Sequence, residues 1–230
     1  MTTDLSALNL IGAALFLFAS HALPSWPGLR PALIARMGRG GFVALHSLGS
    51  TLALLLFVWA YREAAGGAPL FTPARWAAPL VVALMPVAFL LVVARVTSKA
   101  GHPEAPNPPK GIFRITRYPG SLGLLLWALL HLQATGDGRR VVLFVTMAAI
   151  ALFAMAKNDW VLRRSAAGRA YRAETSVLPF AAILTGRQRL ALGEIGREIG
   201  WWRPLAGLAA YAGMIAVHPL LFGIDPLYWL

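Results

Sequence analysis

Six long apolar runs divide this chain of 230 residues, and shorter segments that hold most of the charged residues separate them. Each run is close to the ~20 residues that an α-helix needs to cross ~30 Å of hydrocarbon. A chain in hydrocarbon must satisfy its own backbone hydrogen bonds, so such runs predict transmembrane helices. We expect one all-α domain, 1–230, a polytopic transmembrane helical bundle with spans at about 5–24, 41–61, 76–95, 119–135, 140–157 and 204–222.

Composition agrees with a membrane protein and excludes other classes. The chain is 58% hydrophobic and 13% charged, with a mean hydropathy of +0.64, whereas soluble domains carry about 25% charged residues. The net charge of +12 lies in the loops between apolar runs, so we expect the lipid bilayer as a partner and no nucleic acid. The absence of cysteine excludes disulfides, Cys-ligated zinc or iron–sulfur sites and a thiol nucleophile.

The loop cations also predict an orientation. Seventeen of the 21 Lys and Arg lie in or beside the loops after the first, third and fifth runs. By the positive-inside rule these loops face the cytoplasm and both termini are periplasmic, as in a multi-pass protein of a bacterial inner membrane. The first residues lack a basic region and a cleavage site, so we expect no removable signal peptide.

Two loops carry local predictions. Three prolines in 24–40 predict a turn rather than a helix there. Apolar residues spaced between charges predict that Arg187–Trp202 is a helix lying in the membrane interface.

Four of the five histidines lie within the apolar runs: His21, His46, His131 and His218. The fifth, His102, lies in a proline-rich loop, where we expect it to be solvated. A single intramembrane histidine often bonds only to a backbone carbonyl or a neighbouring helix. Four of them, in runs without Asp or Glu, favour neutral imidazoles that ligate a haem iron over carboxylate acid–base chemistry. Zinc is less favoured, because it needs three or four such ligands at one level.

A haem also needs flat space and cations for its propionates. Small residues on one helix face let a flat group or another helix come close. Such faces occur at Ala13 and Ala14 and at Gly120 and Gly123, and the candidate cations are Arg30, Arg114 and Arg117.

The depth of each histidine predicts which of them lie together. At 1.5 Å per residue from the cytoplasmic side, His21 and His46 lie ~5 and ~8 Å deep. On the same scale His131 and His218 lie ~18 and ~21 Å deep. Straight helices therefore predict two layers, His21 with His46 and His131 with His218.

Motifs around the fourth run resemble a known family. Residues 111–119 read Gly-Ile-Phe-Arg-Ile-Thr-Arg-Tyr-Pro, and residues 127–131 read Trp-Ala-Leu-Leu-His. Together with Leu-Arg-Pro-Ala-Leu-Ile-Ala-Arg-Met-Gly at 29–38 and Val-His-Pro-Leu-Leu-Phe-Gly-Ile at 217–224, they resemble the NnrU family and its relatives, the 15-cis-zeta-carotene isomerases. The family pattern has a histidine where this chain has Tyr118.

The resemblance implies haem b held by two axial histidines, which fall on His21 and His131. It implies a hydrophobic small molecule such as a polyene, and an apolar bundle pocket would also suit a quinone. It further implies a role in isomerisation or in nitrite and nitric oxide metabolism, that is, denitrification. Tyr118 is then either a ligand of ferric haem or an anchor in the interfacial aromatic belt.

The sequence leaves three classes of function open. The first is a haem-b protein with a redox, isomerase or nitrogen-oxide-linked role. The second is an S-adenosylmethionine-dependent methyltransferase, because some residues resemble the isoprenylcysteine and phospholipid methyltransferases: Arg117, Pro119, Gly123, Gly168 and Tyr171. In those enzymes a histidine stands at Tyr118, and a glutamate pair at Asn158 and Asp159. The third is a non-enzymatic membrane protein with structural histidines.

Overall fold

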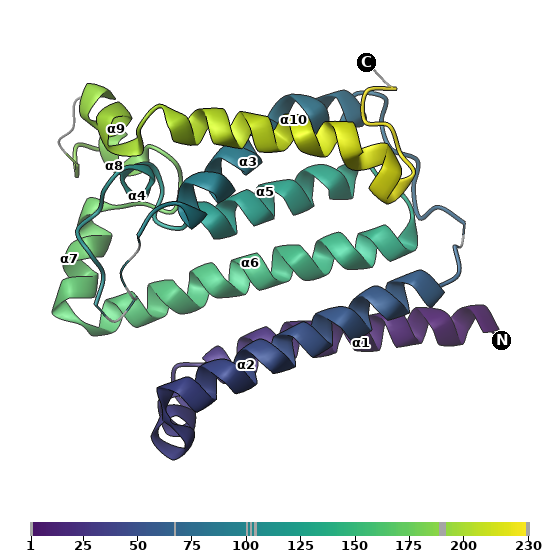
Figure 1. The fold of residues 1–230 in the computed structure, drawn as a ribbon, viewed down its shortest axis with the longest axis horizontal. Coiled ribbons are helices and arrows are strands. Elements are labelled where there is room, and N and C mark those ends of the chain that lie inside the picture. The colour runs from purple at the N-terminus through teal and green to yellow at the C-terminus, as the bar shows by residue number, and fades with distance from the viewer. Residues whose placement is uncertain are drawn as a thin grey trace. The chain divides into compact units, whose positions relative to one another are not determined.

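The computed structural model describes residues 2–66, 68–99, 101, 103, 105–188 and 192–228. In those residues the chain forms ten helices and no β-strand (Figure 1): α1 (Thr2–Ser25), α2 (Leu29–Glu63), α3 (Ala77–Val96), α4 (Ile112–Ile115), α5 (Pro119–Gln133), α6 (Gly138–Arg164), α7 (Ala166–Glu174), α8 (Ala181–Leu184), α9 (Leu192–Ile199) and α10 (Trp202–Phe222). Five of them, α1, α2, α3, α6 and α10, are long and apolar enough to cross a bilayer. The chain is therefore an all-helical, multi-pass membrane protein, as its apolar runs predict.

Helix α5 is shorter than the predicted fourth span. It has 15 residues, which extend about 22 Å, less than the ~30 Å of a typical hydrocarbon core. Pro119 stands at its first position, where the missing N–H removes no helical hydrogen bond. Asp137 then starts α6, because its carboxylate accepts the backbone N–H groups of Arg139 at 2.9 Å and Arg140 at 3.2 Å.

The prediction of a turn at 24–40 is wrong. Helix α1 runs to Ser25 and α2 begins at Leu29, so only three residues separate them. Pro31 falls in the first turn of α2, where a proline is tolerated. The break comes at Gly38, with φ 74° and ψ 165°, a conformation that costs little without a Cβ.

Other boundaries follow the sequence more closely. Helix α6 runs seven residues past the predicted end at 157, to Arg164. Helix α9 forms inside the predicted interfacial segment Arg187–Trp202, while 189–191 lie outside the described residues. His102 also lies outside the described residues.

The chain divides into two compact units, which we describe separately. Unit 1 comprises Met1–Ala74 and His131–Lys157. There α1 packs along α2 (Figure 1), mainly through small residues, and the buried contact includes Ala13 and Ala14. We expected these alanines to leave space for a haem, but the packing of α1 against α2 fills the space beside them.

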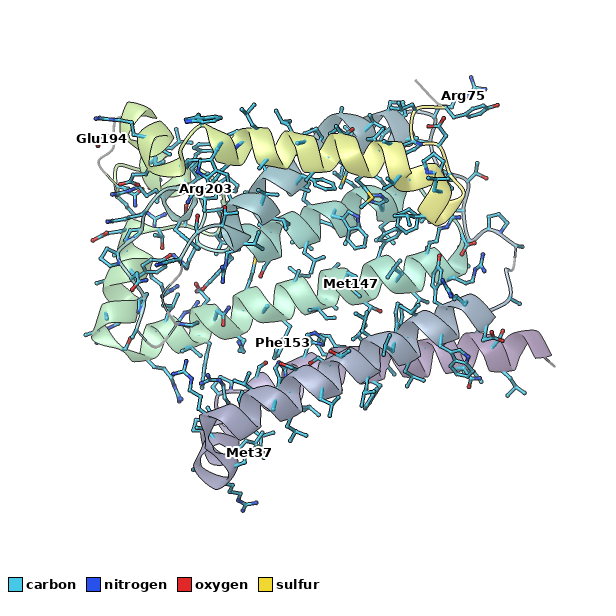
Figure 2. The ribbon with its side chains drawn as sticks, viewed as in Figure 1. Met37, Arg75, Met147, Phe153, Glu194 and Arg203 are labelled. Atoms are coloured by element: carbon cyan, nitrogen blue, oxygen red, sulfur yellow. The ribbon has the colours of Figure 1, made fainter. Side chains whose placement is uncertain are left out.

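Unit 2 comprises Arg75–Leu130 and Asn158–Leu230. There α3 packs against α10, and Tyr211 on α10 donates a hydrogen bond to the carbonyl of Val82 at 2.7 Å. A Cβ on Gly123 of α5 would lie 2.9 Å from the Ala88 carbonyl oxygen, so this glycine also serves close helix packing. Arg203, labelled in Figure 2, ties the start of α10 to the end of α3 through the hydroxyl and carbonyl of Thr97, at 3.1 and 3.2 Å.

Candidate functional site

Unit 1 brings two intramembrane histidines together. The ring centroids of His21 and His46 lie 6.2 Å apart, with an interplanar angle of 75°. His21 stands in the last turns of α1, and His46 in the first half of α2. This is the pairing that the depth estimate predicts.

The protonation of His21 follows from its neighbours. Its Nδ1 lies 3.0 Å from the carbonyl oxygen of Leu17, one turn back on α1, and 3.2 Å from the hydroxyl of Ser20. A carbonyl only accepts hydrogen bonds, so Nδ1 carries the proton. The lone pair of His21 is then on Nε2, and this arrangement is typical of a histidine that ligates a metal.

His46 has an unsatisfied nitrogen. Its ring stacks on Phe42, with centroids 5.8 Å apart and an interplanar angle of 5°. Its Nδ1 and the hydroxyl of Ser50, one turn further along α2, are buried and have no hydrogen-bond partner among the described residues. Because a buried polar atom without a partner costs about 1–3 kcal/mol, this pair indicates a place where a ligand completes the structure. A Cβ on Gly49 would meet nothing within 4 Å, so the space beside Gly49 is open.

Positive charge lies next to the histidine pair. The guanidinium of Arg30 lies 5.6 Å from the ring centroid of Phe42, which stacks on His46. Lys157, near the end of the α6 part of unit 1, lies close enough to His46 and to Arg30 for their charges to interact. On the same helix, the ring of Phe153, which is labelled in Figure 2, stacks on that of Trp26, with centroids 6.1 Å apart.

The other two predicted histidines are placed differently. His131, near the end of α5, belongs to unit 1, and its ring lies 5.0 Å from that of Phe144. His218 belongs to unit 2, and its Nδ1 donates to the carbonyl of Ile224 at 2.8 Å. His218 therefore makes the same kind of Nδ1–carbonyl contact as His21, and the pairings of His131 with His21 or His218 stay predictions.

Unit 2 holds a polar cluster around Arg117 and Asp159. Arg117 is 7% exposed and forms an ion pair with Asp159, near the end of α6. Its Nε donates to the hydroxyl of Thr175 at 2.9 Å, and its Nη2 donates to the carbonyls of Thr175 at 2.7 Å and Arg172 at 3.1 Å. Asp159 also pairs with Arg172 at 3.0 Å and Arg163 at 3.4 Å. One carboxylate thus contacts three guanidinium groups.

Tyr118 is part of this cluster. Its hydroxyl donates to Asp159 at 3.1 Å. Burial and the Asp159 charge raise the pKa of Tyr118 far above its usual range, and burial raises the pKa of Tyr171 to about 12. Both phenols are therefore neutral hydrogen-bond donors at physiological pH.

Local structure holds the cluster in place. The backbone N–H of Arg117 donates to the carbonyl of Ser176 at 2.7 Å, which joins the segment before α5 to the segment after α7. The hydroxyl of Ser165 caps α7 by accepting the N–H of Gly168 at 2.9 Å. A Cβ on Gly168 would overlap the carbonyl of Leu162, so the corner between α6 and α7 requires glycine.

Arg114, predicted as a cofactor cation, has a partner of its own. It forms a two-pronged ion pair with Glu198 on α9, with distances of 2.7 and 2.9 Å. The same carboxylate accepts the backbone N–H of Gly111 at 2.7 Å. The Arg114 guanidinium lowers the pKa of Glu198, and this hydrogen bond raises the pKa of Arg114.

Several of these groups were not predicted from the sequence. Ser50 lies one turn from His46 and can be found by listing polar residues beside each histidine, whereas Lys157 lies on α6, which contains no histidine. Glu198 gives no local signal, because its partner Arg114 is 84 positions away.

Comparison with known proteins identifies relatives. The family described as NnrU protein matches residues 9–226. A 15-cis-zeta-carotene isomerase, chloroplastic, from Zea mays is 39% identical over 82 residues, which cover 35% of this chain and 22% of that protein. Its counterpart from Arabidopsis thaliana is 34% identical over 122 residues, or 52% of this chain and 33% of that protein. The matches thus span at most a third of the length of these relatives, and no solved structure matches the chain. Because the family match covers almost all of the sequence, this chain belongs to the NnrU family.

Proposed function

We propose that this protein binds haem b in unit 1 and carries out isomerase-type chemistry on an apolar polyene. The observation that supports haem most directly is the 6.2 Å separation of the His21 and His46 rings. These two imidazoles would hold the iron, because they lie close together in unit 1. The unsatisfied Nδ1 of His46 would be free to bind it directly.

The residues of unit 1 have defined roles in this proposal. The Leu17 carbonyl fixes the tautomer of His21, so that Nε2 is the ligating atom. Stacking on Phe42 fixes the plane of the His46 ring. Arg30 and Lys157 supply positive charge for the propionate carboxylates. A bound haem supplies a one-electron redox centre in an apolar environment.

Three residues predicted for haem binding have other partners in the structure: Arg114 pairs with Glu198, and Arg117 and Tyr118 with Asp159. The proposal places the propionates on Arg30 and Lys157 because these cations lie near the histidine pair. The resemblance assigns His131 rather than His46 as the second axial ligand. The two assignments make different predictions for alanine variants of these two histidines.

The substrate class comes from the relatives. Both are named for a cis-carotene, a long apolar polyene; a quinone has similar apolar character. The association of the family with nitrite and nitric oxide metabolism gives the same haem an alternative, nitrogen-oxide-linked role in denitrification.

Absorption spectroscopy tests the haem. The full chain is made in cells supplied with haem precursor, purified in mild detergent, and measured oxidised and dithionite-reduced. We expect a low-spin haem-b spectrum that His21→Ala and His46→Ala abolish. His218→Ala is the matched control and should keep it. Loss of the spectrum in His131→Ala but not in His46→Ala would assign the axial pair to His21 and His131, and a colourless wild-type protein would overturn the haem proposal.

Activity is tested on the haem-loaded protein. It is incubated with 15-cis-zeta-carotene in detergent, and the isomers are separated by chromatography. We expect conversion by wild type and none by His21→Ala. Unchanged carotene with a correct haem spectrum would reject the isomerase role and leave the nitrogen-oxide role to be tested by nitric oxide binding to the reduced haem.

The geometry does not favour the methyltransferase alternative. In that class a carboxylate pair contacts the cofactor. Here the single carboxylate at this position, Asp159, is shared by three arginines and Tyr118. Calorimetry with S-adenosylmethionine should therefore show no binding.

A further inference from the structure

A pocket of about 510 Å³ lies in unit 2, apart from the proposed haem residues. Its walls come from the end of α3, the proline-rich loop that follows, the first turn of α5, the end of α6 and α7. Ligand pockets in proteins usually measure about 300–1,000 Å³. The volume is therefore sufficient for a small molecule or a lipid headgroup.

The lining of this pocket is positively charged. Four of its side chains are cationic: Arg95, Lys99, Lys110 and Arg117. Asp159 balances the charge of Arg117. Across the ranges that the structure describes, Arg95, Lys99 and Lys110 form no ion pair with a carboxylate, and no Asp or Glu is among the lining residues. Glu198, which is ion-paired with Arg114, lies near enough to Lys110 for their charges to interact. The pocket still carries an excess of positive charge, and a bound anion would reduce the repulsion among its cations.

Arg95 is held at the pocket by its neighbours. Its guanidinium lies 5.9 Å from the ring centroid of Phe113. A Cβ on Gly120 would come 2.9 Å from Cγ of Arg95, so this glycine leaves room for the arginine stem against α5. We expected a cofactor to use the space next to Gly120. The side chain of Arg95 occupies it instead.

The remaining polar lining suits an anion. Tyr171, Ser121 and Asn158 line the pocket as neutral groups that can donate hydrogen bonds, whereas the Tyr118 hydroxyl already donates to Asp159. Cations and neutral donors recognise phosphate through charge-assisted hydrogen bonds. Phe113 and Leu162 add apolar surface, which the glycerol part of a lipid can contact.

The pocket also lies where phosphate is available. It opens at the end of α3 and the start of α5, at the boundary between membrane spans and loops. Basic pockets at such boundaries bind anionic headgroups. We propose that this pocket binds a phosphate-bearing anion through Arg95, Lys99 and Lys110. An anionic phospholipid reaches it from the bilayer, and a soluble phosphate ester from the water.

Native mass spectrometry of the full chain in detergent tests the proposal. The probes are phosphatidylglycerol, which is anionic, and phosphatidylcholine, which carries no net charge. The test variant is Lys99→Gln/Lys110→Gln. The matched control, Arg36→Gln/Arg39→Gln, removes the same charge from exposed positions of α2. Since each cation near an anionic lipid contributes roughly a factor of five, we expect the test variant to bind phosphatidylglycerol about twentyfold more weakly and the control less than about twofold more weakly.

Competition separates the two sources of phosphate. Glycerol 3-phosphate or inorganic phosphate is added at millimolar concentration to wild type with bound phosphatidylglycerol. Displacement of the lipid would identify a soluble phosphate compound as the ligand of the pocket. Failure to displace it, with preference over phosphatidylcholine, would assign a lipid headgroup. Equal weakening in the test and control variants would overturn the anion site. Arg95→Gln gives a second test if the double variant fails to fold. The haem spectrum should be unchanged in all of them, so this proposal and the haem proposal fail independently.

Discussion

Replacing Asp159 by asparagine keeps the shape of the side chain and removes one charge. The Asp159 side chain is 16% exposed, and that of Arg117 is 6% exposed. Removing one partner of a buried ion pair costs about 3–5 kcal/mol, because the other charge stays buried. Arg117 keeps three hydrogen bonds to Thr175 and Arg172, which favours the lower value, about 3 kcal/mol. For a chain of this size, that lowers Tm by about 6–12 °C.

The assay is thermal unfolding in detergent, followed by the intrinsic fluorescence of the eight tryptophans. Asp137→Asn is the matched control, because Asp137 pairs with Arg139 and both side chains are more than a quarter exposed. An exposed pair contributes less than about 1 kcal/mol, so this control should lose no more than about 2–4 °C. If the Tm decreases equally in both variants, the buried Arg117–Asp159 pair contributes no more to stability than an exposed pair.

A double variant isolates the charge. Arg117→Gln alone leaves Asp159 with Arg172 and Arg163, whereas Asp159→Asn alone leaves Arg117 without a carboxylate. In Arg117→Gln/Asp159→Asn neither charge remains. Its loss in stability should therefore be smaller than the sum of the two single losses by about 2 kcal/mol.

Two further predictions concern unit 2. The Arg114 guanidinium holds the pKa of Glu198 below its ordinary value of 4.5. A lowered carboxyl pKa stabilises the fold above that value and loses the effect as the pH falls through the folded pKa. The Tm difference between wild type and Glu198→Gln should thus be constant near neutral pH and vanish in acid; a difference that grows in acid would contradict it. Gly168→Ala places a Cβ on the Leu162 carbonyl and should cost about 2 kcal/mol or more in a thermal melt, whereas Gly193→Ala, with open space inside α9, should be neutral or stabilising. Equal Tm values for the two alanine variants would refute the steric argument.

The positions of the long helices could be predicted because span length and apolar composition are local properties. Helix α10 begins two residues before its predicted start and ends at the predicted residue, Phe222. The error in 24–40 has a physical cause: Pro31 is compatible with the first turn of a helix, so the turn is confined to 26–28 and the next break comes at Gly38. The number of prolines therefore predicted a turn over residues that are mostly helical.

The candidate site could be predicted only where the depth of a residue in the membrane determines its neighbours. His21 and His46 meet because the last turns of α1 pack against the middle of α2. The partners of Arg117 depend on long-range packing: Asp159 is 42 positions away, and Thr175 is 58 positions away. No periodicity in the sequence encodes such pairs. The small residues were correctly seen as sites of close approach, but at Gly123 the group that approaches is a neighbouring helix.

The shortness of α5 means that another protein segment, rather than lipid, surrounds the backbone that follows this helix. A helix of about 22 Å leaves ~8 Å of a typical hydrocarbon core unspanned. Protein covers that end, because the N–H of Leu70 donates to the Gly136 carbonyl at 2.8 Å and the backbone of Phe71 fills the space beside Gly136. Irregular backbone at membrane depth is tolerated when protein buries it. The residues that follow α5 can therefore lie at membrane depth without exposing unpaired backbone groups to lipid.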